Sequence, residues 1–88
     1  MSLETRYYSL TEASTMVGRQ FKAAYGYFGV PGGTIGVVDE IYEMRPNEYG
    51  IKIKWLGLKS NIRDGFSRTD MEMSIQGKPA MIEVDGWH

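Results

Sequence analysis

The chain has 88 residues, enough for one domain and too few for two. Its 42% apolar, 12% aromatic and 24% charged residues are typical of a globular protein and exclude intrinsic disorder. Ten basic against eleven acidic residues give a net charge of −1, which excludes a generic polyanion binder that is basic all over. The lack of cysteine excludes disulfides, thiolate zinc sites and a cysteine nucleophile.

The lack of a recognisable targeting signal favours a cytoplasmic protein. No apolar run approaches the roughly 18 residues that a membrane-spanning helix needs, and the first thirty residues lack the basic-then-apolar pattern of a signal peptide. We therefore expect a single domain over residues 1–88, with residues 1–8 as a loose N-terminal arm.

A short helix is predicted for residues 9–17. Ser9 stands three residues before Glu12, the spacing at which a hydroxyl and a carboxylate cap each other's backbone donors. Four apolar residues then share one face of the helix: Leu10, Ala13, Met16 and Val17. We expect this face to cover an open end of the core.

The next segments alternate like strands. Phe21, Ala23 and Tyr25 fall on one side of a first strand, and the glycines and proline of residues 26–33 then form a loop. Residues 34–44 predict a long second strand, whose alternation is interrupted near Val38-Asp39 by a bulge or bend.

Three further strands follow. A turn at residues 45–48 leads into residues 49–56, the clearest alternation in the chain, in which Ile51, Ile53 and Trp55 share one face. After it we expect a polar loop, a tight helical turn, a short strand, a last strand and a tail: residues 57–65, 66–71, 73–75, 80–84 and 85–88.

These elements predict a mainly β fold, a small five-stranded antiparallel barrel over residues 18–84 behind a short N-terminal helix. Closure into a barrel is attractive at this length because it removes the exposed edges of a small sheet.

Three short motifs make the chain resemble the Src-homology-3-like small barrels: residues 21–27, similar to the Ala-Leu-Tyr-Asp-Tyr-type motif; residues 33–38, similar to the Gly-x-x-Gly-x-Val strand entry; and residues 64–70, similar to the helical turn before the last strand. The resemblance implies a binding module for proteins or nucleic acids. It does not imply recognition of Pro-x-x-Pro peptides, because the first loop lacks acidic residues and the third strand lacks paired tryptophans.

Few residues suit catalysis. The single histidine is the last residue, His88, so no Ser-His or Cys-His pair and no nitrogen or sulfur metal site is expected. The carboxylates of Asp39, Glu40 and Glu43 cluster, as solvated strand faces usually do. We therefore expect a protein that is not an enzyme and has no cofactor or metal.

Charge is distributed unevenly. Residues 45–68 carry six basic and two acidic residues, a net charge of +4, whereas residues 69–88 carry one basic and four acidic residues, a net charge of −3. The first segment predicts a basic face that can meet phosphates, with Tyr49 adding stacking; its cations are Lys52, Lys54, Lys59 and Arg63. The alternative is that these lysines only keep a strand face soluble.

The glycine-rich loop supplies a second candidate surface. Tyr25, Tyr27 and Phe28 lie in or beside it, and aromatic side chains on loops are enriched at recognition surfaces. The alternative is that Phe28 and Val30 fold back over the barrel end. Trp55 is predicted to belong to the core.

Two functions remain open. The first is a protein-interaction module, an inhibitor or accessory subunit with aromatic anchors and a basic face that steers it to an acidic protein partner. The second is a barrel that binds nucleic acid through residues 45–68. No membrane partner is expected, and the protein is a monomer or a homodimer.

Overall fold

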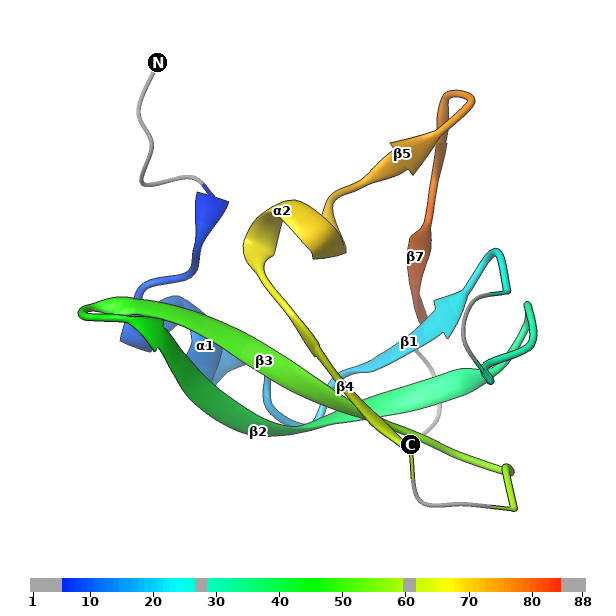
Figure 1. Cartoon of the computed structure of the whole chain (residues 1–88), viewed down its shortest axis with the longest axis horizontal. Helices are drawn as coiled ribbons and strands as arrows, with labels where there is room; N and C mark the ends of the chain where they lie inside the picture. The colour runs from blue at the N-terminus through cyan, green and yellow to red at the C-terminus, as the bar shows by residue number, and fades with distance from the viewer. Residues whose placement is uncertain (1–5, 27–28, 60–61, 85–88) are drawn as a thin grey trace.

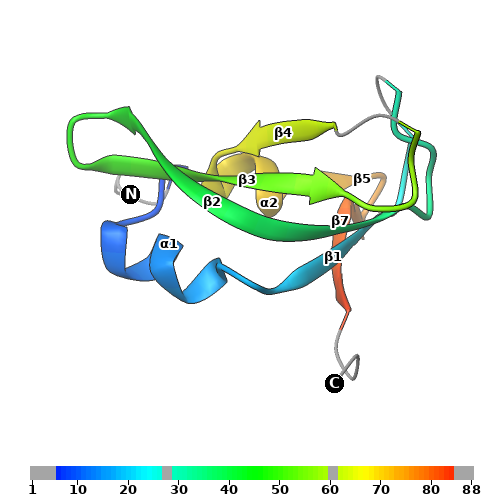
Figure 2. The same ribbon diagram turned by 90° about the horizontal axis from the view of Figure 1, so that it is seen from below.

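The computed structural model describes residues 6–26, 29–59 and 62–84. Five antiparallel strands form one sheet in the order β4-β3-β2-β1-β7. They are β1 (Gln20–Ala23), β2 (Ile35–Arg45), β3 (Glu48–Trp55), β4 (Arg63–Phe66) and β7 (Met81–Val84). The sheet curls strongly into a half-barrel (Figures 1 and 2), with helix α1 (Leu10–Met16) ahead of it. The predicted mainly β, five-stranded antiparallel fold with a short N-terminal helix is confirmed.

Helix α1 begins where the sequence predicts. The Ser9 hydroxyl accepts a hydrogen bond from the Glu12 backbone at 3.1 Å, and the Glu12 carboxylate accepts one from the Ser9 backbone at 2.9 Å. The predicted apolar face is only partly right, because Ala13 and Met16 are buried whereas Leu10 is 52% and Val17 46% exposed. The helix has only seven residues, so the centre of its apolar face packs against the core while the residues at its two ends stay exposed.

Strand β2 has the bend that its sequence predicts. Its pairing with β3 shifts between Val38 and Glu40, and again between Glu43 and Arg45. Ahead of the first shift, Gly36 and Val38 face the core. A Cβ on Gly36 would meet Trp55 at 2.7 Å, so the glycine allows β2 and the tryptophan to pack closely. The hairpin to β3 turns at Asn47, whose φ of 64° asparagine tolerates.

Strand β3 supplies the centre of the core. Ile51, Ile53 and Trp55 alternate inward and are at most 2% exposed, as predicted. The Trp55 indole packs edge-on against Phe66 and donates a hydrogen bond to the Asp64 carboxylate at 2.7 Å. This bond satisfies the one polar atom of the buried ring.

The fourth strand of the sheet was not predicted. Arg63–Phe66, interpreted from the sequence as the end of a loop and the start of a turn, forms β4 against β3. Its Asp and Gly have low strand propensity, so only the pairing with β3 makes the segment a strand. The expected strand at residues 73–75 is also placed differently: β5 (Ser74–Ile75) pairs with β6 (Lys78–Pro79) in a separate ribbon.

The segments near both ends of the described chain also contact the curled sheet. Helix α2 (Arg68–Met71), the predicted helical turn, has a capping box of Ser67 and Asp70. In β7 the buried residue is Met81, and Ile82 is 40% exposed. Tyr8 does not belong to a loose arm: it is buried, and it exchanges two 2.9 Å backbone hydrogen bonds with Tyr49, beyond the point where β4 ends.

Candidate binding surfaces

Three predicted cations share the outer face of the sheet. Lys52 and Lys54 alternate with the buried residues of β3, and Arg63 of β4 stands directly opposite Lys54. Side chains directly opposite each other in an antiparallel pair lie on the same face. Lys59, exposed in the segment after β3, completes the predicted set.

Acidic residues of β2 compensate part of this charge. Glu40 stands opposite Lys52, and Arg63 donates to Asp39 at 2.9 Å from its Nε, with its Nη2 at 2.9 Å from the same carboxylate oxygen. The other oxygen of Asp39 is buried and has no hydrogen-bond partner among the described residues. The outer face therefore carries both acidic and basic side chains, and it is less basic than the net charge of residues 45–68 predicts.

Tyr42 lies on the same face, which sequence reasoning missed. Its ring covers Gly50 and Gly65, since a Cβ at Gly65 would meet the Tyr42 hydroxyl at 2.5 Å. The Lys52 ammonium lies 5.4 Å from the ring centroid. Burial raises the pKa of the Tyr42 hydroxyl, and the nearby Asp70 carboxylate adds to the shift. The one signal in the sequence was Gly50 within the predicted strand 49–56, because a glycine inside a strand often marks a close approach, whereas Gly65 fell in the expected loop.

Tyr49 is not placed with the cations. It belongs to the inward-facing series of β3, packs against the core and pairs with Tyr8. The expectation that Tyr49 joins the basic face is wrong, because the side chains of Tyr49 and Lys52 point to opposite faces of the same strand.

The glycine-rich loop is described only in part. Val30 is 1% exposed and folds back into the core, as one of the two interpretations had it. Tyr27 and Phe28 lie outside the described residues. Tyr25 is half-buried beside the ribbon, and its hydroxyl donates a 3.4 Å hydrogen bond to the Ile75 carbonyl.

Tyr25 lines an apolar groove of about 370 Å³. The groove lies between the end of β1, the end of β4 and the ribbon, and its lining is Tyr25, Gly26, Gly65, Phe66, Asp70, Met73, Ile75 and Ala80. Met73 is 45% and Ile75 37% exposed. A 2.9 Å backbone hydrogen bond from Ala24 to Ala80 ties the ribbon to the end of β1, and a second, from Ala80 to Met73, extends the ribbon's own pairing.

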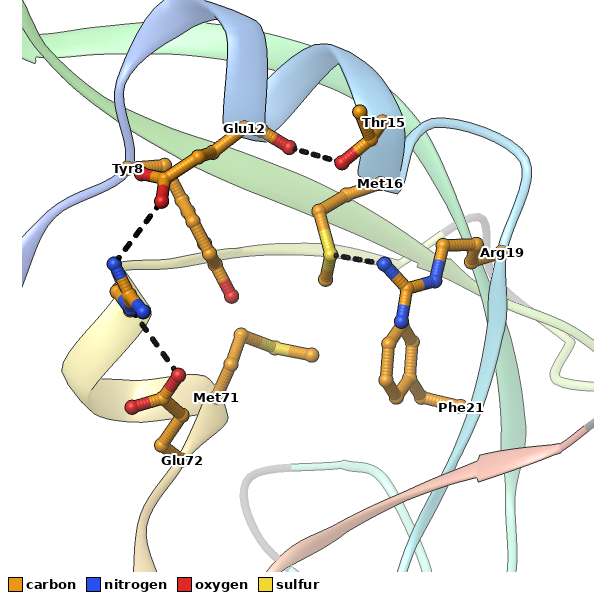
Figure 3. A pocket seen from close by; sticks show the side chains of 9 residues that line it. Tyr8, Glu12, Thr15, Met16, Arg19, Phe21, Met71 and Glu72 are labelled. Atoms are coloured by element: carbon orange, nitrogen blue, oxygen red, sulfur yellow. Dashed lines mark hydrogen bonds and ion pairs between the residues drawn. The ribbon is translucent and has the colours of Figure 1, made fainter.

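A second cavity, of about 330 Å³, lies between α1 and α2 (Figure 3). Buried Tyr8, Met16, Phe21 and Met71 form its apolar lining. At its rim Arg68 donates to Glu12 at 3.3 Å and to Glu72 at 3.2 Å, while Arg19 donates two 2.6 Å hydrogen bonds to Glu83.

The Tyr8 hydroxyl is surrounded by these charges. Burial is the largest cause that raises its pKa; Glu72 and Glu12 raise it further, and Arg68 and Arg19 act in the opposite direction. No sequence pattern indicated this cavity, because its residues come from two distant segments, 8–21 and 68–72, and Tyr8 falls in the expected arm.

No three His, Cys, Asp or Glu residues are grouped to hold a metal ion within residues 6–26, 29–59 and 62–84. No helix in the described part of the chain is long and apolar enough to cross a membrane. Comparisons with protein-family models, curated proteins and solved structures find no significant match.

Proposed function

We propose that the protein is a non-enzymatic protein-interaction module, an inhibitor or accessory subunit, that binds a protein partner in the groove beside Tyr25. The observation that carries this proposal is the concentration of exposed apolar side chains at the groove. Met73 and Ile75 remain exposed on a paired ribbon that the backbone hydrogen bond from Ala24 to Ala80 ties to the end of β1. A held apolar surface of this kind loses less entropy on binding than a free loop does.

The chemistry of the groove suits an apolar anchor from a partner. Aromatic rings at Tyr25 and Phe66 offer flat walls, and Met73 has a flexible, polarisable side chain that adapts to different shapes. Lys52 and Lys54 of the outer face, together with the exposed Lys59, would then steer the protein toward an acidic partner. This steering contributes to the association rate more than to affinity.

We also propose that the fold belongs to the Src-homology-3-like class. A Src-homology-3-like barrel is supported by the antiparallel meander from β1 to β4 and by the helical turn α2, which precedes the last strand β7. The ribbon of β5 and β6 is inserted between these two elements. Folds of this class serve many binding roles, so the groove and not the fold carries the function.

The test compares two pairs of exposed apolar residues. The variant Met73→Ser with Ile75→Ser removes the groove's apolar rim. The control variant Leu10→Ser with Val17→Ser removes apolar side chains at least as exposed, from the first residue and the C-cap of α1. A tagged protein captures its partner from nuclease-treated lysate, and calorimetry then measures the affinity of the purified pair. We expect the groove variant to lose at least about tenfold in affinity and the α1 variant to bind like the parent. Equal binding by the parent and the groove variant would refute the proposal.

Nucleic-acid binding is the second candidate, favoured by the alignment of Lys52, Lys54 and Arg63 on one face with Tyr42 beside them. Lys52→Glu with Lys54→Glu should abolish it, and the affinity of the parent should fall steeply with salt. The same variant should only slow association with a protein partner. A capture that disappears with nuclease treatment supports this second function.

A further inference from the structure

Two cavities meet at one ion pair. The cavity between α1 and α2 adjoins another of about 470 Å³, which reaches the β2–β3 turn at Pro46, Asn47 and Glu48. Tyr8, Glu12 and Arg68 line both cavities. The two cavities therefore adjoin at the contact of Arg68 with Glu12, and we refer to them together as the channel.

Arg68 is held weakly in this position. Its side chain is 29% exposed, and its partners Glu12 and Glu72 are 49% and 62% exposed. The hydrogen bonds of 3.3 and 3.2 Å are longer than those of close charge-assisted pairs. Ion pairs this exposed are easily exchanged, because water and salt screen them. A guanidinium or ammonium group from another protein can replace Arg68 between the two carboxylates.

The rest of the cavity suits the remainder of such a side chain. Met16, Phe21 and Met71 present apolar surface, on which the aliphatic stem of a lysine or arginine can pack. Tyr8 is 8% exposed, and Figure 3 shows its hydroxyl directed into the space between α1 and α2. In the described part of the chain the hydroxyl makes no hydrogen bond, so its oxygen is available to accept one from a cation.

The balance of charge also favours a cation. Three carboxylates line the channel, from Glu12, Glu48 and Glu72, against two guanidinium groups. One of these, on Arg19, is already bound by the carboxylate of Glu83 through two 2.6 Å hydrogen bonds. An incoming anion would be repelled by these three carboxylates, and the guanidinium group of Arg19 would already be paired with Glu83.

We propose that this channel is a second binding site, which takes a lysine or arginine side chain of a protein partner by displacing Arg68 from Glu12 and Glu72. The site shares no lining residue with the groove beside Tyr25. The two proposals can therefore fail separately.

The test uses methionine methyl groups as reporters in NMR titrations of the full chain. N-acetyl-arginine methylamide is the probe, and the corresponding norleucine and glutamate compounds are its neutral and anionic controls. The arginine compound should shift the methyl signals of Met16 and Met71 and leave those of Met44 and Met81 in place. The norleucine compound should bind at least about threefold more weakly, and the glutamate compound should produce no shift.

Variants then test whether the site binds a positively charged group. Arg68→Ala frees both carboxylates, so it should tighten binding of the arginine compound about threefold or more. Glu12→Gln with Glu72→Gln should weaken it about fivefold or more, and Arg63→Ala, which breaks a pair on the outer face, should leave it unchanged. Weaker binding by Arg68→Ala, binding of the glutamate compound, or no shift with any compound would overturn the proposal.

Discussion

At the scale of single residues, two glycines of the outer face decide where Tyr42 lies. Gly50 and Gly65 belong to neighbouring strands, and the ring of Tyr42 covers the backbone of both. A side chain at Gly65 would occupy the space of the Tyr42 hydroxyl and Cζ, at 2.5 and 2.9 Å. The glycines thus allow an aromatic ring to shield the backbone of a short edge strand, β4.

This arrangement predicts coupling between Gly65 and Tyr42. Gly65→Ala should destabilise the parent by about 1–3 kcal/mol, because the added methyl displaces the ring. In a Tyr42→Ala background the same change should cost less than about 0.5 kcal/mol. Urea unfolding of the four proteins in the cycle measures both values, and equal costs in the two backgrounds would show that the ring does not restrict this position.

At the scale of elements, helix α1 depends on its cap. The helix has seven residues, too few to be stable without capping and packing. Ser9 and Glu12 satisfy two of its first backbone donors, and Ala13 and Met16 fix the helix to the core. Its exposed ends, Leu10 and Val17, contribute little to this attachment.

The cap can be tested with two serines of one helix. Ser9→Ala should lower the free energy of unfolding by about 0.5–2 kcal/mol, since the Glu12 backbone loses its acceptor. Ser14→Ala is the matched control: its hydroxyl donates back to the Leu10 carbonyl, a bond that contributes little to helix stability. Thermal unfolding of both variants provides the comparison, and an equal loss in the two would argue against the capping box.

At the scale of the whole molecule, ion pairs join segments that are far apart in the chain. Arg19 ahead of β1 binds Glu83 of β7, and Arg68 of α2 binds Glu12 of α1. The first pair joins β7, an edge strand of the sheet, to its neighbour β1, and the second joins the two helices. The hydrogen bond that the Ser9 backbone N–H donates to the carboxylate is the main cause that lowers the pKa of Glu12. The hydrogen bonds that Arg19 donates are the main cause that lowers the pKa of Glu83.

These shifts predict a loss of stability in acid. Because folding lowers both pKa values below the ordinary 4.5, the unfolded chain binds more protons than the folded protein near that pH. The contribution of both groups is complete above about pH 5 and disappears as the pH falls below the folded-state values. The unfolding midpoint should therefore drop between pH 5 and 3, and this drop should shrink in Glu12→Gln with Glu83→Gln. An undiminished drop would assign the acid sensitivity to other carboxyl groups.

The elements that carry a local signal could be predicted from the sequence. The Ser9–Glu12 spacing predicted the start of α1, and the alternation through Ile51, Ile53 and Trp55 predicted β3 and its buried face. The interrupted alternation near Val38 predicted the bend of β2. In each case the signal lies within one short segment, where period and capping chemistry act before the fold is complete.

The sequence does not reveal which segments complete the sheet or which residues form the cavities, because both depend on contacts between distant parts of the chain. Asp64 and Gly65 have low strand propensity, so β4 exists because β3 offers a pairing edge. Tyr8 enters the core because the backbone of β3 at Tyr49 lies beyond the end of β4 and can pair with it. The channel at Arg68 joins residues more than fifty positions apart, and its charges and apolar surface act as one site only after the chain has folded.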